Sequence, residues 1–409
     1  MAPAAVIDIG TTKICALVGE KTAKGAWRIL GAGIAVARGI RKGVVVDVNQ
    51  AAESIASAVE QAERVAGMRI EGALLNISGT HIESTNSRGV AAIQGNRAVT
   101  PDDIERALES AEAIAVPQNR EIIHAIPRGF TLDGQEGVKD PLGMIGFRLE
   151  VEAHIATGAV PPIQNLIKAA QTAGIRANEL VFAPIAAGSA VLTPAEKEMG
   201  VIVADIGGGT TDLAVFIDGS VWQSVVLPVG GINITNDLAV GLRAPFDAAE
   251  DLKVNQGRID FAALSEDQVL DITTFGEEGQ RAISMRLMAE IIDARIEEIL
   301  QLILTEIKRA GYDNLLPAGV VLCGGTAKLP GLKAKAREIL KLPVRIGFPL
   351  EIEGFVDRVS SPAFATSVGL LNWCAQNGNA KNATVRTPKS GGNALGDLLG
   401  WARRAFLPG

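Results

Sequence analysis

The feature that most constrains this fold is a strand–glycine turn–strand pattern that occurs twice in the chain. The first copy, DIGTT at 8–12, follows the apolar run AAVI and precedes KICALVG. The second copy, DIGGGTT at 205–211, follows VIVA and precedes DLAVFI. Repetition of a supersecondary unit indicates a duplicated domain core. Buried strands alternate with helical segments in both halves, so we expect an α/β fold of two related halves with a cleft between them.

The first glycine turn has the chemistry of a phosphate-binding loop. Gly10 allows a tight turn, after which backbone N–H groups can point at a phosphate. Thr11 and Thr12 add hydroxyl donors, Lys13 follows closely, and Asp8 would face a bound metal–phosphate. Taken alone, the motif is also compatible with an ordinary hairpin that contains a glycine.

The second turn is a stronger signal. Three consecutive glycines at 207–209 weaken a sheet without any gain in packing, unless the backbone must approach a ligand. Asp205 is expected to share Mg²⁺ with Asp8 through water, because Mg²⁺ keeps much of its hydration shell. No G-x-G-x-x-G opens a helix and no G-K-[ST] is present, which argues against Rossmann and P-loop sites.

A third glycine pair, Gly324 and Gly325, ends the apolar run VVLC, and Leu329-Pro330-Gly331 opens a helix after it. This element is suited to hold a purine and ribose. Glu250 and Lys253 lie one helical turn apart. The alternative for that pair is a solvated surface ion pair.

Five segments, taken in order, resemble the signature of the actin, heat-shock chaperone and sugar kinase superfamily. They are DIGTTKI, LVFAPIAAGSAVL, DIGGGTTDL, VVLCGGTAKLPGL and ATSVGLL. The resemblance implies an actin-like two-domain α/β fold with a nucleotide cleft, ATP and Mg²⁺ as cofactors, and Asp8 and Asp205 as the residues that hold the metal. The nucleotide-binding residues it implies are Asp8, Gly10, Thr11, Thr12, Lys13, Asp205, Gly207, Gly208, Gly209, Thr210, Glu250, Lys253, Gly324 and Gly325.

Within this superfamily the chain is most similar to the FtsA family of cell-division proteins. GGINITNDLAVGLRAPFDAAEDLKVNQG at 230–257 resembles the family's second small subdomain, and NISGTHIES…RAVTPDDIERALE resembles its SHS2-type α+β insertion. The family resemblance implies a protein that polymerises on the cytoplasmic face of the membrane at the septum. It also implies that the protein tethers FtsZ filaments of the Z ring, recruits other divisome proteins and uses ATP as its assembly switch.

The resemblance and the composition together suggest a division of the chain into successive parts. The first core is expected at 1–80, completed by 161–197 and 361–375, with the insertion at 81–160. The second core is expected at 198–232, completed by 312–360, with a second small subdomain at 233–311. A flexible linker at 376–392 and an amphipathic membrane helix at 393–409 would follow.

The net charge, the cysteine spacing and the first residues argue against several classes of protein. The formal net charge of -7 disfavours nucleic-acid binding. Cys15, Cys323 and Cys374 are far apart and lack metal-ligand spacing, which indicates buried thiols in a reducing cytoplasm. The opening MAPAAVIDIG lacks a basic n-region, which predicts a buried strand rather than a signal peptide.

The C-terminal segment is basic and amphipathic. On a helix its apolar residues would share one side, opposite two arginines, as in helices that lie in a membrane interface. The alternative is a helix that docks on the protein's own core. The expected membrane-binding residues are Leu395, Leu398, Leu399, Trp401, Arg403, Arg404 and Phe406.

Residues around 281–300 have helical periodicity, with methionines flanked by arginines on one face. Such a face suits a short acidic and apolar peptide, and the family resemblance implies the C-terminal peptide of FtsZ. The alternative is core packing with arginines at the rim. The expected partner-binding residues are Arg281, Met285, Met288 and Arg295.

The rival functions are a sugar kinase-type phosphotransferase and a pilus-assembly module like PilM. A kinase requires a carboxylate base, and no candidate stands out in the sequence. The superfamily places Glu or Gln in the segment that aligns with 181–188, where this chain has Ala183. We therefore assign no catalytic residue and expect ATP hydrolysis to be weak or absent.

Overall fold

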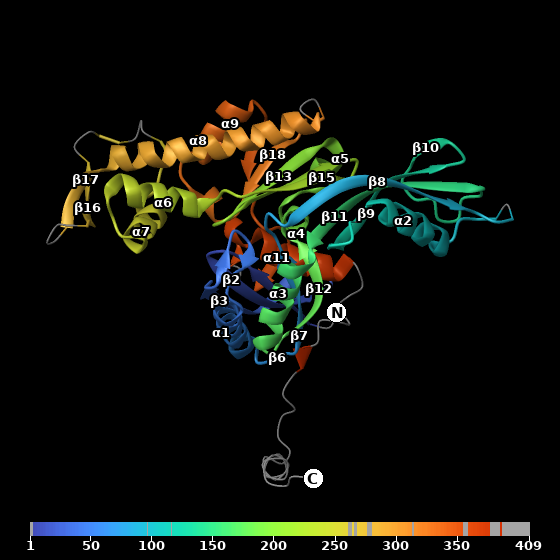
Figure 1. Cartoon of the computed structure of the whole chain (residues 1–409), viewed down its shortest axis with the longest axis horizontal. Helices are drawn as coiled ribbons and strands as arrows, with labels where there is room; N and C mark the ends of the chain where they lie inside the picture. The colour runs from blue at the N-terminus through green and yellow to red at the C-terminus, as the bar shows by residue number, and fades with distance from the viewer. Residues whose placement is uncertain are drawn as a thin grey trace, which may run out of the picture.

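The computed structural model describes residues 3–95, 97–115, 117–260, 264–265, 268–275, 280–312, 315–354, 359–376 and 385–386. Two sheets with their helices form two lobes that meet at the centre of the molecule (Figure 1). The predicted membrane helix at 393–409 lies outside the described residues. Within the described part, no helix combines the length and apolar character needed to cross a membrane.

The first lobe is built on a six-stranded sheet in the order β12-β7-β1-β2-β3-β20. Every residue of β1 and β7 is buried, as expected for strands covered on both faces. The strands are β1 (Ala4–Ile9), β2 (Lys13–Lys21), β3 (Trp27–Val36), β7 (Gly72–Ile77), β12 (Arg176–Phe182) and β20 (Ile352–Gly354). Its helices are α1 (Val48–Ala66), α3 (Val160–Thr172), α4 (Ala183–Val191) and α11 (Ala365–Gln376).

The second lobe repeats the strand pattern of the first. Its five-stranded sheet has the order β15-β14-β13-β18-β19. β13 pairs antiparallel with β14 and parallel with β18, as β1 does with β2 and β7, which is the duplication that the sequence predicts. The strands are β13 (Val201–Ile206), β14 (Thr211–Ile217), β15 (Ser220–Leu227), β18 (Gly319–Cys323) and β19 (Val344–Ile346). The helices are α6 (Gly231–Leu242), α7 (Phe246–Gln256), α8 (Met285–Ala310) and α9 (Leu332–Leu340).

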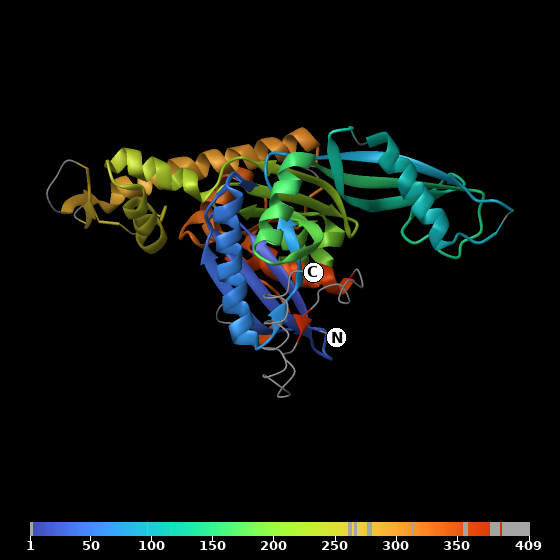
Figure 2. The same ribbon diagram turned by 60° about the horizontal axis from the view of Figure 1, so that its bottom comes forward.

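An α+β insertion with its own hydrophobic core extends to one side of the lobes (Figures 1 and 2). Its four-stranded antiparallel sheet has the order β10-β9-β11-β8, and α2 packs against it. The elements are β8 (Ile82–Ala92), α2 (Pro101–Ala115), β9 (Arg120–Leu132), β10 (Gln135–Val138) and β11 (Arg148–Ala159). The remaining short elements are β4 (Ile40–Arg41), β5 (Val44–Val45), β6 (Arg69–Ile70), α5 (Pro194–Met199), η2 (Gly325–Lys328), η3 (Pro362–Phe364) and β21 (Val385–Arg386).

The helix predicted around 281–300 begins later than its periodicity suggested. Arg281 lies in β17 (Gln280–Ser284), which pairs with β16 (Val269–Thr273), and α8 begins only at Met285. Met288 is fully buried in the core, as the core-packing alternative expected. Arg295 is held by Asp237, with Nε 2.6 Å from Oδ2. The expectation that these residues share one helix face was therefore wrong for Arg281, because pairing of β17 with β16 sets the direction of its side chain.

Close approach of α1 to β3 depends on glycine. A Cβ added to Gly33 would lie 1.9 Å from the Ala58 carbonyl oxygen, so the helix backbone packs directly on the strand. The helix is capped at its C-terminal end by Gly67, which adopts the left-handed conformation at φ 65°.

We expect Gly33→Ala to lower the free energy of unfolding by about 1–3 kcal/mol, because an overpacked core must shift its backbone. Gly129, in β9, is the matched control, since its added Cβ would have no atom within 4 Å. Gly129→Ala should change stability by no more than about 0.5 kcal/mol. Urea unfolding of both variants measures the difference, and equal midpoints would contradict this account of the packing.

Candidate functional site

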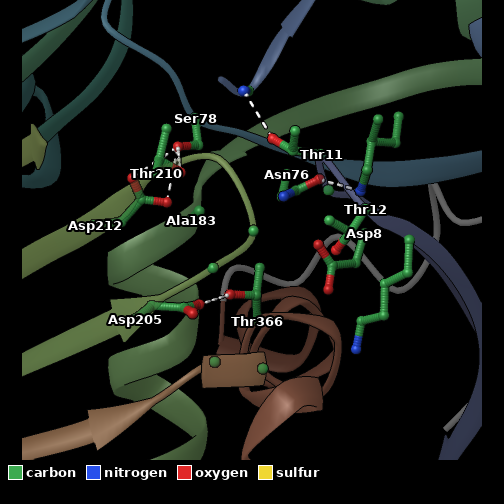
Figure 3. Close-up of a pocket in the computed structure, with 18 of the residues that line it drawn as sticks. Asp8, Thr11, Thr12, Asn76, Ser78, Ala183, Asp205, Thr210, Asp212 and Thr366 are labelled. Carbon is green, nitrogen blue, oxygen red and sulfur yellow. Dashed lines mark hydrogen bonds between the residues drawn. The ribbon is translucent and has the colours of Figure 1, made fainter. Parts of the chain in front are cut away.

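The two glycine turns meet between the lobes and line one cavity of about 130 Å³ (Figure 3). The β1–β2 turn approaches from the first lobe, and the β13–β14 turn approaches from the second. The start of η2 also lines the cavity. The sequence-predicted residues found in this lining are Asp8, Gly10, Thr11, Thr12, Lys13, Asp205, Gly207, Gly208, Thr210, Gly324 and Gly325.

Hydrogen bonds fix the shape of each turn. The Gly10 N–H donates to the Lys13 carbonyl at 3.0 Å, and the Gly207 N–H donates to the Thr210 carbonyl at 2.9 Å. The side chain of Asn76, at the end of β7, accepts from the Ile9 N–H at 2.6 Å. Each turn is therefore closed by the same kind of hydrogen bond, from the glycine N–H to the carbonyl three residues later, as expected of duplicated structures.

The glycines of the second turn are required by contact with the first. A Cβ on Gly208 would lie 2.4 Å from Thr12 Cγ2, and one on Gly209 would lie 2.6 Å from Thr11 Oγ1. Gly324 has φ +88°, and its added Cβ would lie 2.4 Å from Asp205 Oδ1. Side chains at these positions would separate the lobes or fill the cavity.

Asp8 and Asp205 lie at the ends of β1 and β13, and each accepts a hydrogen bond from α11. Ser367 Oγ donates to Asp8 Oδ2 at 2.6 Å, and Thr366 Oγ1 donates to Asp205 Oδ2 at 2.7 Å. Burial raises the pKa of Asp205 to about 6, and it also raises the pKa of Asp8. Neither hydroxyl was assigned a role from the sequence, although both belong to the signature segment ATSVGLL.

A third carboxylate, Asp212, also lines the cavity and was missed by sequence reasoning. Ser78 Oγ, from the first lobe, lies 2.8 Å and 2.7 Å from its two carboxylate oxygens. Burial and then the negative charge of Asp205 raise the pKa of Asp212 to about 8. Figure 3 shows Asp212, Ser78 and Ala183 at the same end of the cavity. The available signal was the aspartate that directly follows DIGGGTT.

Lys13 is the one cationic side chain among the described residues that line this cavity. Its ammonium group donates to the Ala363 carbonyl and lies 3.5 Å from the centroid of the Phe364 ring. Asp8 and Asp212 are buried and Asp205 is partly buried, so three carboxylates line the cavity against this single amine and acidic groups are in excess.

The donor set fits a hydrated divalent cation. No group of three or more His, Cys, Asp or Glu residues within the described ranges is arranged to hold a metal directly. Mg²⁺ usually takes one or two carboxylates and completes its shell with water and phosphate oxygens. Asp8 and Asp205 supply two carboxylates, and the glycine turns leave space for the other ligands.

A larger cavity of about 390 Å³ adjoins the first and shares Thr12, Gly207, Gly208, Gly325 and Ala363 with it. Glu250 and Lys253, from α7, line this second cavity. Lys253 Nζ lies 2.6 Å from Glu250 Oε2 and also donates to Thr235 Oγ1 at 2.8 Å. The Lys253 side chain is 14% exposed and the Glu250 side chain 33%, so the pair is partly buried and not a fully solvated surface pair.

Other predicted site residues lie elsewhere. Gly209 contacts the first turn but does not line the cavities, and Arg281, Met285, Met288 and Arg295 line neither cavity. The predicted membrane residues of 395–406 are outside the described part of the chain.

The fold resembles solved actin-like structures. The PilM–PilN type IV pilus biogenesis complex aligns with a TM-score of 0.65 at 17% identity, covering 90% of this chain and 97% of that one. MreB5 of Spiroplasma citri bound to ADP aligns with a TM-score of 0.51 at 14% identity, covering 93% and 98%. At such identities these likenesses show the fold, which is the actin-like α/β architecture expected from the sequence.

Comparison with known protein sequences identifies the family, whereas the structural likenesses show only the fold. A family model described as cell division protein FtsA matches residues 202–369, and a model of the SHS2 domain inserted in FtsA matches 79–157. Cell division protein FtsA of Pseudomonas aeruginosa is 40% identical over 370 residues, covering 90% of this chain and 88% of that protein. FtsA of Neisseria meningitidis serogroup B is 39% identical over 406 residues, covering 98% of each. The chain belongs to the FtsA family of cell-division proteins.

Proposed function

We propose that this protein binds ATP with Mg²⁺, polymerises on the cytoplasmic face of the cell membrane at the septum, and tethers FtsZ filaments there. In this role it would recruit further divisome proteins to the Z ring. The observation that carries the proposal is the cavity between two related lobes, lined by a glycine turn from each, in a chain of the FtsA family.

The two adjoining cavities suit the two ends of a nucleotide. The smaller one offers backbone N–H groups, hydroxyls and Lys13 to phosphates, while the larger one offers Glu250 and Lys253 to the ribose. When bound, Mg²⁺ would neutralise phosphate charge beside Asp8 and Asp205. The two carboxylates would orient water molecules of its hydration shell.

A nucleotide in this position would contact both lobes at once. Such a ligand favours the closed arrangement of the lobes by its differential affinity for that arrangement. If closed lobes present the surface that joins subunits, ATP acts as the assembly switch.

We expect ATP hydrolysis to be slow or not measurable. Ala183 is 3% exposed at the wall of the phosphate cavity, and its methyl group can neither orient water nor accept a proton. One contributor of about 10²–10⁴ in rate is therefore absent. Phosphate release with and without lipid measures this, with Asp205→Ala as the control that impairs metal binding. Turnover of roughly 1–100 per second would favour the rival phosphotransferase, with Asp212 as its candidate base.

Membrane attachment is proposed for the C-terminal segment. Deletion of residues 392–409 should leave ATP binding intact and abolish co-sedimentation with anionic vesicles. Trp401→Glu with Phe406→Glu should act alike, because charges on an apolar face are costly to bury. FtsZ should also reach the vesicles only with the intact chain. Unchanged co-sedimentation of the truncated chain would refute the membrane assignment.

The FtsZ peptide is proposed to bind the second small subdomain near Arg281 and Met285, where α8 begins. Arg281 is exposed, so Arg281→Glu should weaken binding of an acidic FtsZ C-terminal peptide with little change in thermal stability. Lys308→Glu makes the same charge change at an exposed position near the other end of α8 and should leave binding unchanged. Fluorescence anisotropy of the labelled peptide measures both. Equal affinities for the two variants would exclude Arg281 from the site.

A further inference from the structure

The insertion is attached to both lobes. It joins the first lobe through the backbone at Ser78–His81 and at Ala159–Val160, and His124 Nε2 accepts from the Phe182 N–H of β12 at 3.0 Å. It docks on the second lobe along β15, the edge strand of that sheet. Any movement of one lobe against the other must therefore change the contacts of the insertion with at least one of them.

The insertion docks on β15 through polar side chains that donate hydrogen bonds to backbone carbonyls of this edge strand. Ser84 Oγ donates to the Ser224 carbonyl at 2.6 Å, and Asn86 Nδ2 donates to the Trp222 carbonyl at 3.1 Å. His154 is 1% exposed and links the two strands. Its Nδ1 lies 2.8 Å from Asn86 Oδ1, and its Nε2 lies 2.7 Å from Ser224 Oγ. An edge carbonyl that loses such a partner must find water instead, so the interface favours a defined geometry.

The same stretch of chain that docks on β15 also enters the nucleotide cavity. Ser78 bonds Asp212 in the cavity, and Ser84 and Asn86 follow it on β8. The partners of these residues lie on one hairpin, since Asp212 of β14 pairs with Val226 of β15, and Ala214 pairs with Ser224. Both ends of this stretch therefore contact the β14–β15 hairpin across the boundary between the lobes.

We propose that the segment 78–86 couples occupancy of the nucleotide cavity to docking of the insertion on β15. This inference rests on the proposed ATP binding between the lobes. A nucleotide that fixes the β14–β15 hairpin against the first lobe fixes the Ser78–Asp212 contact and, through the same segment, the Ser84 and Asn86 contacts. The docking of the insertion on β15 thus depends on whether a nucleotide is bound, and a protein that binds the insertion meets a different arrangement in each state.

Hydrogen–deuterium exchange of the full chain, with and without saturating ATP and Mg²⁺, tests the coupling. Saturation is verified for each variant by calorimetry. In the wild type, ATP should slow exchange of the amides in 82–86 and 220–227 by about fivefold or more, because local opening is suppressed. Ser78→Ala should lose at least half of that protection even when saturated. Ser87→Ala removes a hydroxyl that bonds the Ala111 carbonyl within the insertion, and it should retain the full effect.

A second variant tests the coupling from the opposite end. Because coupling is reciprocal, weakening the docking should weaken ATP binding. Asn86→Ala, which contacts β15 and does not line the nucleotide cavities, should raise the Kd for ATP by about threefold, while Ser87→Ala leaves it unchanged.

The outcomes separate the two proposals. No ATP binding by the wild type would overturn the proposed function itself. ATP binding without slower exchange in 82–86 and 220–227 would overturn the coupling alone. Full protection in saturated Ser78→Ala, together with an unchanged Kd in Asn86→Ala, would also overturn it.

Discussion

The architecture depends on a contact between two glycine turns that leaves no room for side chains. Thr11 and Thr12 of the first lobe lie where Cβ atoms on Gly209 and Gly208 would stand. The lobes can approach this closely only because the backbone of the second turn is bare. The glycines that follow β13 weaken the end of the sheet, because they are conformationally free. The pairing of β13 with β14 and β18 must offset this loss of stability.

The same approach brings acidic groups together. Asp8, Asp205 and Asp212 line one cavity in which Lys13 is the one cation from the described residues. Burial raises the pKa of each carboxyl, so the ionised cavity is unstable without a counter-charge. A hydrated divalent cation would supply that charge, and the hydroxyls of Ser367, Thr366 and Ser78 orient the carboxylates. The site therefore suits a metal–phosphate complex better than a free phosphate.

The sequence predicts the parts of this arrangement that are local. Glycines at strand ends predict both turns, and the repeat of DIG motifs predicts two related lobes. Long-range neighbours were not predictable, because nothing near Ser78 in the sequence indicates its contact with Asp212, which is 134 residues away. The α8 boundary was misjudged for a different reason: residues 281–284 continue the helical spacing, but pairing with β16 holds them in a strand. The burial of Met288 likewise depends on packing that periodicity alone does not reveal.

We propose that the carboxylates between the lobes serve a metal–nucleotide. Isothermal titration of ATP, with Mg²⁺ and with a chelator, tests it most directly. Removal of Mg²⁺ should weaken binding to the wild type by about tenfold or more, since buried carboxylates then face an uncompensated triphosphate. In the double variant Asp8→Asn, Asp205→Asn that dependence on Mg²⁺ should largely disappear. ATP binding by the wild type that is equally tight with and without Mg²⁺ would contradict the claim.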